Sequence, residues 1–412
     1  MSTALLLESP EFENPSPART EELALQPVRA KSARYESLDM WRGLCCLMLV
    51  VFHTTMQTAR HYFVDLSGKV NDVGSLGMWL AARAWIGVPI FFVISGYCIM
   101  AAMYARRSKG GVIVFAKRRF WRIYPPYWTA IGLSAVVILA MNIRWPGLTH
   151  EGIFTVPIPE KMTFWQWFGN LTLTESWRHC VFGGDAQHLL PNTWTLCYEE
   201  QFYVISALIL VFASQRIFTA AIVVTGLIFV GKTISWTLGW DVEGSLLDGR
   251  WFEIGAGILL FYRVTKATPK QIVLINALFA AGVFVSLRNP SRLLEFYPNH
   301  DMERFVAYSF ALLASLIYRY DQQMRKARWL RPLWAAGAMS YSIYLCHPLV
   351  AKGISFGFFR AGMTGNAETL GLVVPLCLVA SLGVAYVFYR LVERHFIPPR
   401  APSVAISTKL TA

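Results

Sequence analysis

The stretch Arg42–His53, RGLCCLMLVVFH, places a glycine and nine consecutive apolar residues between a guanidinium group and an imidazole ring. Such a run predicts a membrane helix. A charged side chain near a bilayer centre costs at least a few kcal/mol, so ionisable residues in such a helix usually serve a function. Eleven helical residues make about three turns and rise about 16 Å. We therefore expect Arg42 and His53 on one helix face, with Arg42 near the membrane edge and His53 deeper.

The bulk composition is that of a membrane protein. The chain has 412 residues, of which 55% are hydrophobic and 15% charged, and its mean hydropathy is +0.41. A soluble domain carries about 25% charged residues. The net charge of +13 would suggest nucleic acid as the partner of a soluble protein. In a membrane protein it reflects Lys and Arg retained on the cytoplasmic side, and we expect membrane lipid rather than nucleic acid as a partner.

Ten apolar segments are long enough, or nearly so, to cross a bilayer. They are residues 38–58, 79–103, 124–142, 192–213, 217–238, 250–263, 271–287, 304–319, 333–351 and 369–390. If the N-terminus is cytoplasmic, the inner loops hold more than twice as many Lys and Arg residues as the outer loops, which is the bias of a correctly oriented membrane protein. The prediction is an all-α polytopic protein with about ten transmembrane helices and both termini in the cytoplasm.

The two ends of the chain lack such segments. Residues 1–35 mix prolines, acids and short side chains, and predict a disordered cytosolic arm. Residues 36–400 form the membrane domain, and residues 401–412 a cytosolic tail. The seven cysteines have no paired spacing, so we expect neither a disulfide framework nor a metal site.

A polar cluster opens the fourth segment, WTLCYEEQFY, from Trp194 to Tyr203. Neighbouring residues of a helix point in different directions, so only one of the two glutamates can face a given partner. Glu199, His53 and the His347 of SYSIYLCHPLV reach about the same depth when the rise per residue is counted from each segment end. Three polar side chains at one depth predict a cavity.

Two further stretches leave alternatives open. KRRFWRIYPPYW, Lys117–Trp128, offers arginines suited to binding phosphate, although their spacing alone favours plain cytoplasmic topology with contact to lipid headgroups. The predicted outer loop, residues 143–191, contains several tryptophans together with His179, Asp185 and His188. Its aromatic rings fit either the membrane interface or stacking on a sugar.

These motifs, taken in order, resemble the acyltransferase 3 family of bacterial integral-membrane acyltransferases. The matching stretches run over about residues 35–400. They are LDMWRG followed by His53, FFVISGY, RRFWRIYPPYW, WTLCYEEQFY, SYSIYLCHPL and VERHFIPP. The resemblance implies a protein of the bacterial inner membrane that moves an acyl group, commonly acetyl, from cytoplasmic acyl-CoA to a hydroxyl of a cell-surface polysaccharide, its lipid-linked precursor or another exported glycan.

The resemblance also assigns roles to residues. It implies that acyl-CoA is a co-substrate and that no cofactor stays bound. The essential histidine falls on His53 and its partner arginine on Arg42. The expected acyl-CoA-binding residues are Arg42, Arg119 and Arg122, the glutamate motif falls on Glu199 and Glu200, and the expected cavity or acceptor residues are Trp194, Glu200, Tyr203 and His347. The oligomeric state stays open.

The chemistry suits these residue types. A sugar hydroxyl is a poor nucleophile at neutral pH, and a neutral histidine such as His53 can accept its proton as it attacks a thioester. Glu199 could orient the ring and stabilise the imidazolium. Direct transfer and an acyl-histidine intermediate both remain open.

Two other functions compete with this one. A proton-coupled transporter or flippase would use His53, Glu199 and His347 as a relay. Paired half-length helices or inverted repeats would favour it, and we find neither in the sequence. A receptor or scaffold with buried ion pairs would leave His53 unexplained.

Overall fold

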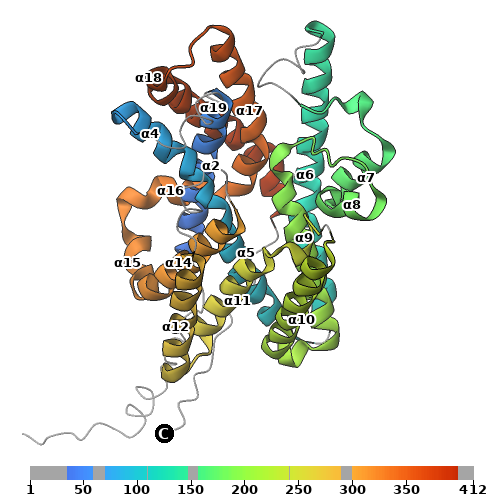
Figure 1. Ribbon diagram of the computed structural model, residues 1–412, viewed down its shortest axis with the longest axis vertical. Coiled ribbons are helices and arrows are strands. Elements are labelled where there is room, and N and C mark those ends of the chain that lie inside the picture. The colour runs from blue at the N-terminus through green and yellow to red at the C-terminus, as the bar shows by residue number, and fades with distance from the viewer. Residues whose placement is uncertain are drawn as a thin grey trace, which may run out of the picture. The chain divides into compact units, whose positions relative to one another are not determined.

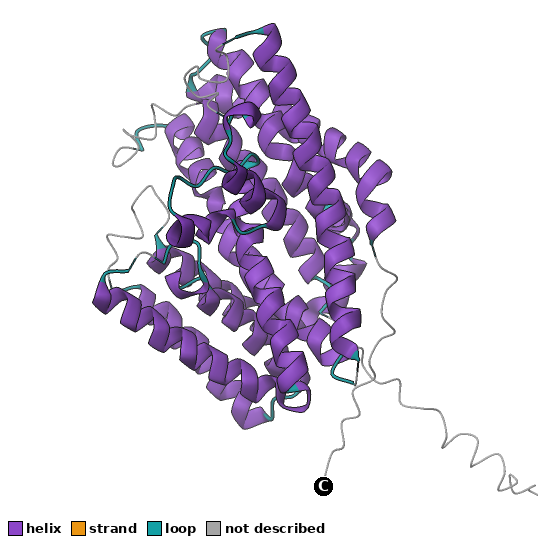
Figure 2. Ribbon diagram, turned by 90° about the vertical axis from the view of Figure 1, so that its right-hand side faces the viewer, coloured by secondary structure: helices purple, strands orange, loops and turns teal. Residues whose placement is uncertain are grey.

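The computed structural model of the chain describes residues 35–58, 70–108, 110–146, 156–240, 242–288 and 299–397. Nearly all of these residues are helical, and no β-strand occurs among them (Figure 2). The predicted all-α class is therefore confirmed for the part of the chain that the structure describes. The predicted arm, apart from Tyr35, and the predicted C-terminal tail lie outside the described residues.

Each predicted membrane segment coincides with a helix or a run of helices (Figure 1). The helices extend beyond the predicted bounds at the start of the second and third segments and at the end of the ninth and tenth. The corresponding helices are α2 (Leu38–Thr58), the run α4 (Val73–Ala82), η1 (Arg83–Ile86) and α5 (Gly87–Ala105), α6 (Gly111–Arg144), α9 (Trp194–Phe212), α10 (Ile217–Leu238), α11 (Trp251–Thr265), α12 (Pro269–Ser286), α14 (His300–Ile317), α16 (Arg331–Ala338) with α17 (Ser340–Arg360), and the run from α18 (Asn366–Glu368) through η10 (Thr369–Val373), α19 (Val374–Phe388) and η11 (Tyr389–Glu393) to α20 (Arg394–Phe396).

Shorter helices connect these long ones. Between α6 and α9 lie η4 (Pro159–Lys161), α7 (Phe164–Thr172), α8 (Glu175–Phe182) and η5 (Pro191–Thr193). Elsewhere the connections are η6 (Ser214–Arg216), η7 (Leu246–Asp248), η8 (Tyr318–Tyr320), α15 (Asp321–Lys326) and η9 (Arg328–Leu330). Side chains start two of the helices, because Thr163 and Thr268 each form a capping box with the glutamine three residues later.

Six helices or helix runs in the described ranges are long and apolar enough to cross a membrane. They are Val73–Ala105, Gly111–Arg144, Pro191–Phe212, Ser214–Leu238, Pro269–Ser286 and Asn366–Phe396. Helices α2, α11, α14 and α17 are outside this set. Helix α11 has only 15 residues, and the other three carry several ionisable side chains, which lower mean hydropathy.

Helix α6 is longer than the sequence suggested. The predicted segment began at residue 124, but the helix begins at Gly111 and continues for 34 residues. The cause is that charged residues end an apolar window without ending a helix, since Lys and Arg are good helix formers. The arginine motif therefore lies on a regular helix, where Arg119 and Arg122 are three residues apart and share a face.

Glycines allow two pairs of helices to touch backbone to backbone. A Cβ atom on Gly43 of α2 would lie 2.0 Å from the carbonyl oxygen of Leu333 in α16. One on Gly96 of α5 would lie 2.1 Å from the carbonyl oxygen of Ile254, and one on Gly257 of α11 would lie 2.0 Å from that of Val93. Such small-residue contacts are typical of membrane helices, and here they hold α2 close to α16 and α5 close to α11.

We predict that Gly257→Ala destabilises the protein by about 1–3 kcal/mol, because the added methyl group forces α11 away from α5. The matched control is Gly255→Ala on the same helix, where a Cβ meets nothing within 4 Å. That change should leave the free energy of unfolding unchanged, or raise it by up to about 1 kcal/mol, because alanine has a higher helix propensity than glycine. Thermal unfolding of the purified variants measures both effects. Equal melting temperatures for the two variants would contradict the packing described here.

Candidate active site

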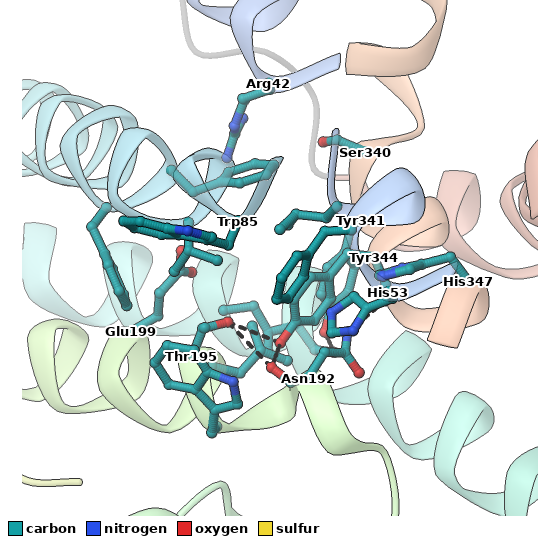
Figure 3. A pocket seen from close by; sticks show the side chains of 18 of the residues that line it. Arg42, His53, Trp85, Asn192, Thr195, Glu199, Ser340, Tyr341, Tyr344 and His347 are labelled. Atoms are coloured by element: carbon teal, nitrogen blue, oxygen red, sulfur yellow. Dashed lines mark hydrogen bonds between the residues drawn. The ribbon is translucent and has the colours of Figure 1, made fainter. Parts of the chain in front are cut away.

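A cavity of about 180 Å³ lies between α2, α5, α6, α9 and α17. We call it the central cavity. The predicted site residues that line it are Arg42, His53, Arg119, Arg122, Trp194, Glu199, Tyr203 and His347. Glu200 is the one predicted site residue that does not line it. Residues far apart in the sequence thus meet around one space, with Arg42 and Ser340 shown apart from the two histidines in Figure 3.

Arg42 and His53 both lie on helix α2. It is an unbroken helix from Leu38 to Thr58, so Arg42 and His53 are separated by about 16 Å along its axis. Both side chains line the central cavity, as the eleven-residue spacing predicts. Arg42 has a long ion pair with Asp39, 3.9 Å between Nη1 and Oδ1. Its buried Nε has no hydrogen-bond partner in the part of the chain that the structure describes.

His53 lies beside a second histidine. The ring centroids of His53 and His347 are 5.3 Å apart, and the ring planes are inclined by 45°. The Nδ1 of His347 lies 2.8 Å from the carbonyl oxygen of Ile343, which can only accept, so Nδ1 carries the proton. The Nε2 of His347 is buried without a partner among the described residues, and in the neutral ring it is a bare acceptor.

The two glutamates of α9 diverge, as neighbouring helical residues must. Glu199 faces the central cavity, where its Oε1 accepts from Ser95 Oγ at 2.5 Å and its Oε2 from Tyr203 OH at 2.9 Å. Glu200 instead interacts with Tyr124 of α6. The sequence suggests Glu199 as the carboxylate that orients the His53 ring. Among the described contacts, the Glu199 oxygens accept hydrogen bonds from Ser95 and Tyr203, and the histidine ring beside His53 is that of His347.

Three guanidinium groups line the central cavity, and their contacts among the described residues are few and long. Besides Arg42, Arg119 reaches the carbonyl oxygen of Cys98 only at 3.5 Å and lies 5.0 Å from the Tyr203 ring centroid. Arg122 Nη2 is 3.9 Å from Glu393 Oε1. Since each guanidinium has five N–H donors, these long contacts leave most of the hydrogen-bonding capacity unused. Such a cluster is suited to an anionic ligand with several oxygens, such as phosphate.

Sequence reasoning missed the residues that hold these groups in place. Glu393 lies in the π-helical turn η11, and its Oε2 accepts from both the backbone N–H and the hydroxyl of Ser342, at 3.0 and 2.6 Å. Its motif, VERHFIPP, was noted without a role. Ser95 belongs to FFVISGY, another motif noted without a role. Its neighbour Gly96 packs against Ile254, and the serine hydroxyl binds Glu199.

A second missed set joins α17 to the start of α9. The amide of Asn192 donates to the Tyr344 carbonyl oxygen, the hydroxyl of Tyr344 donates to the Asn192 carbonyl oxygen, and Thr195 Oγ1 lies 3.0 Å from the Tyr344 hydroxyl (Figure 3). These bonds cross about 150 residues of sequence, and no local pattern signals them. In the view of Figure 3 these three residues lie on the side of the central cavity away from Arg42.

The aromatic residues after α6 divide between two roles. Trp165 stacks on Phe182 with ring centroids 5.0 Å apart, and Phe164 and Phe168 adjoin it. All four are exposed, which fits the membrane-interface interpretation. Trp167 instead donates from Nε1 to the Pro159 carbonyl oxygen, a structural contact.

Comparison with known proteins identifies the family. A model of the acyltransferase domain matches residues 35–390. The chain is 25% identical to peptidoglycan O-acetyltransferase OatA of Listeria monocytogenes over 332 residues, and 25% identical to O-acetyltransferase OatA of Staphylococcus aureus over 395 residues. It is also 25% identical over 394 residues to BcsY of Komagataeibacter xylinus, provisionally named a membrane-bound transacylase. No solved structure matches the chain significantly.

The extent of these matches differs between relatives. They cover 76, 88 and 92% of this chain in the same order, but 48% of the Listeria protein, 57% of the Staphylococcus protein and 87% of BcsY. The chain thus spans about half the length of the OatA proteins it matches. The family match itself covers most of the chain, and its range includes every residue that lines the central cavity. The chain is a multi-pass membrane protein and belongs to the acyltransferase 3 family.

Proposed function

We propose that the protein is a membrane O-acyltransferase, which moves an acyl group, in the simplest case acetyl, from cytoplasmic acyl-CoA to a hydroxyl of an exported or surface glycan. One observation carries the proposal: a single cavity is lined by three arginines with unused donors and by a pair of adjacent histidines. The arginines suit the phosphates of acyl-CoA, and the histidines suit proton transfer at the thioester.

The proposed setting is the inner membrane of a bacterium. Ten helices would cross it, with both termini in the cytoplasm, in keeping with the excess of Lys and Arg on the inner loops. Helices α2 and α17 have 21 residues each, which suffices for a hydrocarbon core of about 30 Å. Arg42 and His53 of α2 and His347 of α17 line the central cavity, which is the usual arrangement for ionisable residues at depth.

The donor would bind from the side of Arg42. Arg42, Arg119 and Arg122 would hold the CoA phosphates, and the pantetheine arm would extend along α2 toward His53. The interval of about 16 Å that the helix sets between Arg42 and His53 suits an extended arm of that kind. Glu199, fixed by Ser95 and Tyr203, lies within electrostatic reach of Arg42 and would keep that guanidinium in place.

The reaction needs one base. His53 would take the proton of the acceptor hydroxyl while the oxygen attacks the thioester carbonyl carbon, and the C–S bond would then break. The leaving thiolate would recover the proton from the His53 imidazolium, so the products are the glycan ester and free CoA. The unprotonated Nε2 of His347 would stabilise the imidazolium from the adjoining ring.

Relatives support a glycan as acceptor. The Listeria protein is named for peptidoglycan O-acetylation, and the Staphylococcus protein is named an O-acetyltransferase. We extend this to a cell-surface polysaccharide, its lipid-linked precursor or another exported glycan as the substrate class of the present chain.

We predict that His53→Ala lowers acyl transfer by about a hundredfold or more, because general base catalysis typically contributes that much. The assay is release of CoA from acetyl-CoA by purified protein in lipid nanodiscs, in the presence of a soluble oligosaccharide acceptor. His395→Ala, which removes an exposed histidine outside the cavity, is the matched control and should match the wild type. A folded His53→Ala variant with full activity would rule out His53 as the base.

We also predict that Arg122→Ala raises the KM for acetyl-CoA at least about tenfold, through loss of a charge-assisted contact with phosphate. Arg118→Ala removes a neighbouring arginine of α6 that does not line the cavity and should change this KM little. With acetyl-pantetheine, which lacks the nucleotide phosphates, Arg122→Ala and wild type should have equal KM values. If the defect is the same with both donors, Arg122 does not bind phosphate.

A further inference from the structure

A second cavity, of about 600 Å³, adjoins the first. We call it the side cavity. Its wall comes from α8, from the segment 184–188, from the first turns of α9 and from the connection between α10 and α11. Trp194 lines both cavities. On α9, Trp194 and Tyr198 face the side cavity, whereas Thr195 and Glu199 face the central cavity, so this helix forms the partition between the two.

One wall of the side cavity is fixed by a buried ion pair. Glu175 and Arg178 of α8 are almost fully buried, with 2.8 Å between Oε2 and Nε. The two Nη atoms of Arg178 donate to the carbonyl oxygens of Gly183 and Asp185 at 2.9 and 3.0 Å, and the Gln187 N–H donates to Glu175 Oε1 at 2.7 Å. A segment without regular structure is thereby held in one shape, and a preformed wall lowers the entropic cost of binding.

Arg250, in another part of the wall, has its positive charge neutralised by two carboxylates. Arg250 donates to Asp248 Oδ2 at 3.0 Å, to Glu303 Oε1 at 3.1 Å and to the Tyr198 hydroxyl at 3.0 Å. Its guanidinium also lies 4.8 Å from the Trp194 ring centroid. Two carboxylates balance this one cation, which leaves no excess positive charge for an anionic ligand. The side cavity therefore differs in kind from the central cavity with its three arginines.

The remaining polar groups suit hydroxyls. The residues Ser176, Asp185, His188 and Glu243 also line the side cavity, and Ser176 Oγ lies 3.4 Å from His188 Nε2. Burial and the neighbouring His179 lower the pKa of His188 to about 4, so the ring is neutral at physiological pH. Carboxylates and a neutral imidazole accept hydrogen bonds from hydroxyl groups, and the rings of Trp194 and Tyr198 add apolar surface. Polar side chains outnumber the indole and phenol rings in this lining, which suits a hydroxyl-rich ligand better than an apolar one.

We propose that the side cavity binds the acyl acceptor as an uncharged, hydroxyl-rich saccharide unit. The sugar to be acylated then passes Trp194 into the central cavity, while the adjoining unit of the chain occupies the side cavity. This assignment rests on the proposed acyltransferase function and deepens it, because it separates the acceptor site from the donor site by chemistry as well as by position.

The test measures saccharide binding without catalysis. Isothermal titration calorimetry of the full chain in lipid nanodiscs, without acyl-CoA, uses cellotetraose and chitotetraose as neutral probes and tetragalacturonate as the anionic probe. The double variant Asp185→Asn/Glu243→Gln keeps shape but removes two charged acceptors. It should raise the Kd for the neutral probes at least about tenfold. Trp194→Leu should also raise this Kd.

A matched control accompanies these variants. Glu160→Gln removes an exposed carboxylate of η4 outside both cavities and should bind like the wild type.

The outcomes separate this inference from the proposed function. Failure of the wild type to bind either neutral probe, preference for tetragalacturonate, or wild-type affinity in the double variant would each overturn the saccharide assignment. If neutral sugars bind as expected but no acetyl group moves from acetyl-CoA, the saccharide site stands and the acyltransferase function fails. If transfer proceeds and the double variant has the wild-type Kd and acceptor KM, the acyltransferase function stands and the saccharide assignment fails.

Discussion

Ionisable side chains inside a helix bundle need partners, because an unpaired charge away from water costs several kcal/mol. Much of the described interior follows this constraint. Arg178 pairs with Glu175, Arg250 with Asp248 and Glu303, and the Glu393 carboxylate binds Ser342. The groups around the central cavity satisfy it only in part. Buried donors and acceptors there, including Arg42 Nε and His347 Nε2, lack partners within the described residues. A site that binds and transforms a polar ligand requires such unused capacity.

Helix packing explains how this arrangement is held. The glycine contacts place α2 against α16 and α5 against α11 at backbone distance, so the cavity-lining faces of α2 and α5 have little freedom to shift. The bonds between Asn192, Thr195 and Tyr344 fasten α17 to α9 from the other side. Because the scaffold is rigid, the cavity can present two different chemistries at fixed positions: guanidinium groups near Arg42 and imidazoles near His53.

The sequence predicts the local features of this structure well. Helix α2 begins and ends where the apolar run does, and the eleven-residue spacing puts Arg42 and His53 into one cavity. The separation of Glu199 from Glu200 also follows from helix geometry alone. The predicted start of α6 was wrong, because hydropathy does not distinguish a charged helical turn from a loop. The pairing of Ser95 with Glu199 and of Ser342 with Glu393 was not predictable, because no periodicity links residues on helices so distant in sequence.

Under the proposed function, a donor from one face of the membrane and an acceptor from the other meet in one cavity. Proteoliposomes in which the protein has a single known orientation test this directly, with radiolabelled acetyl-CoA supplied to one face and a neutral oligosaccharide to the other. Ester should form only when acetyl-CoA is on the face of the N-terminus and the saccharide is on the opposite face. Equal ester formation with both substrates on one face, or passage of the saccharide across the membrane without any ester, would contradict the account.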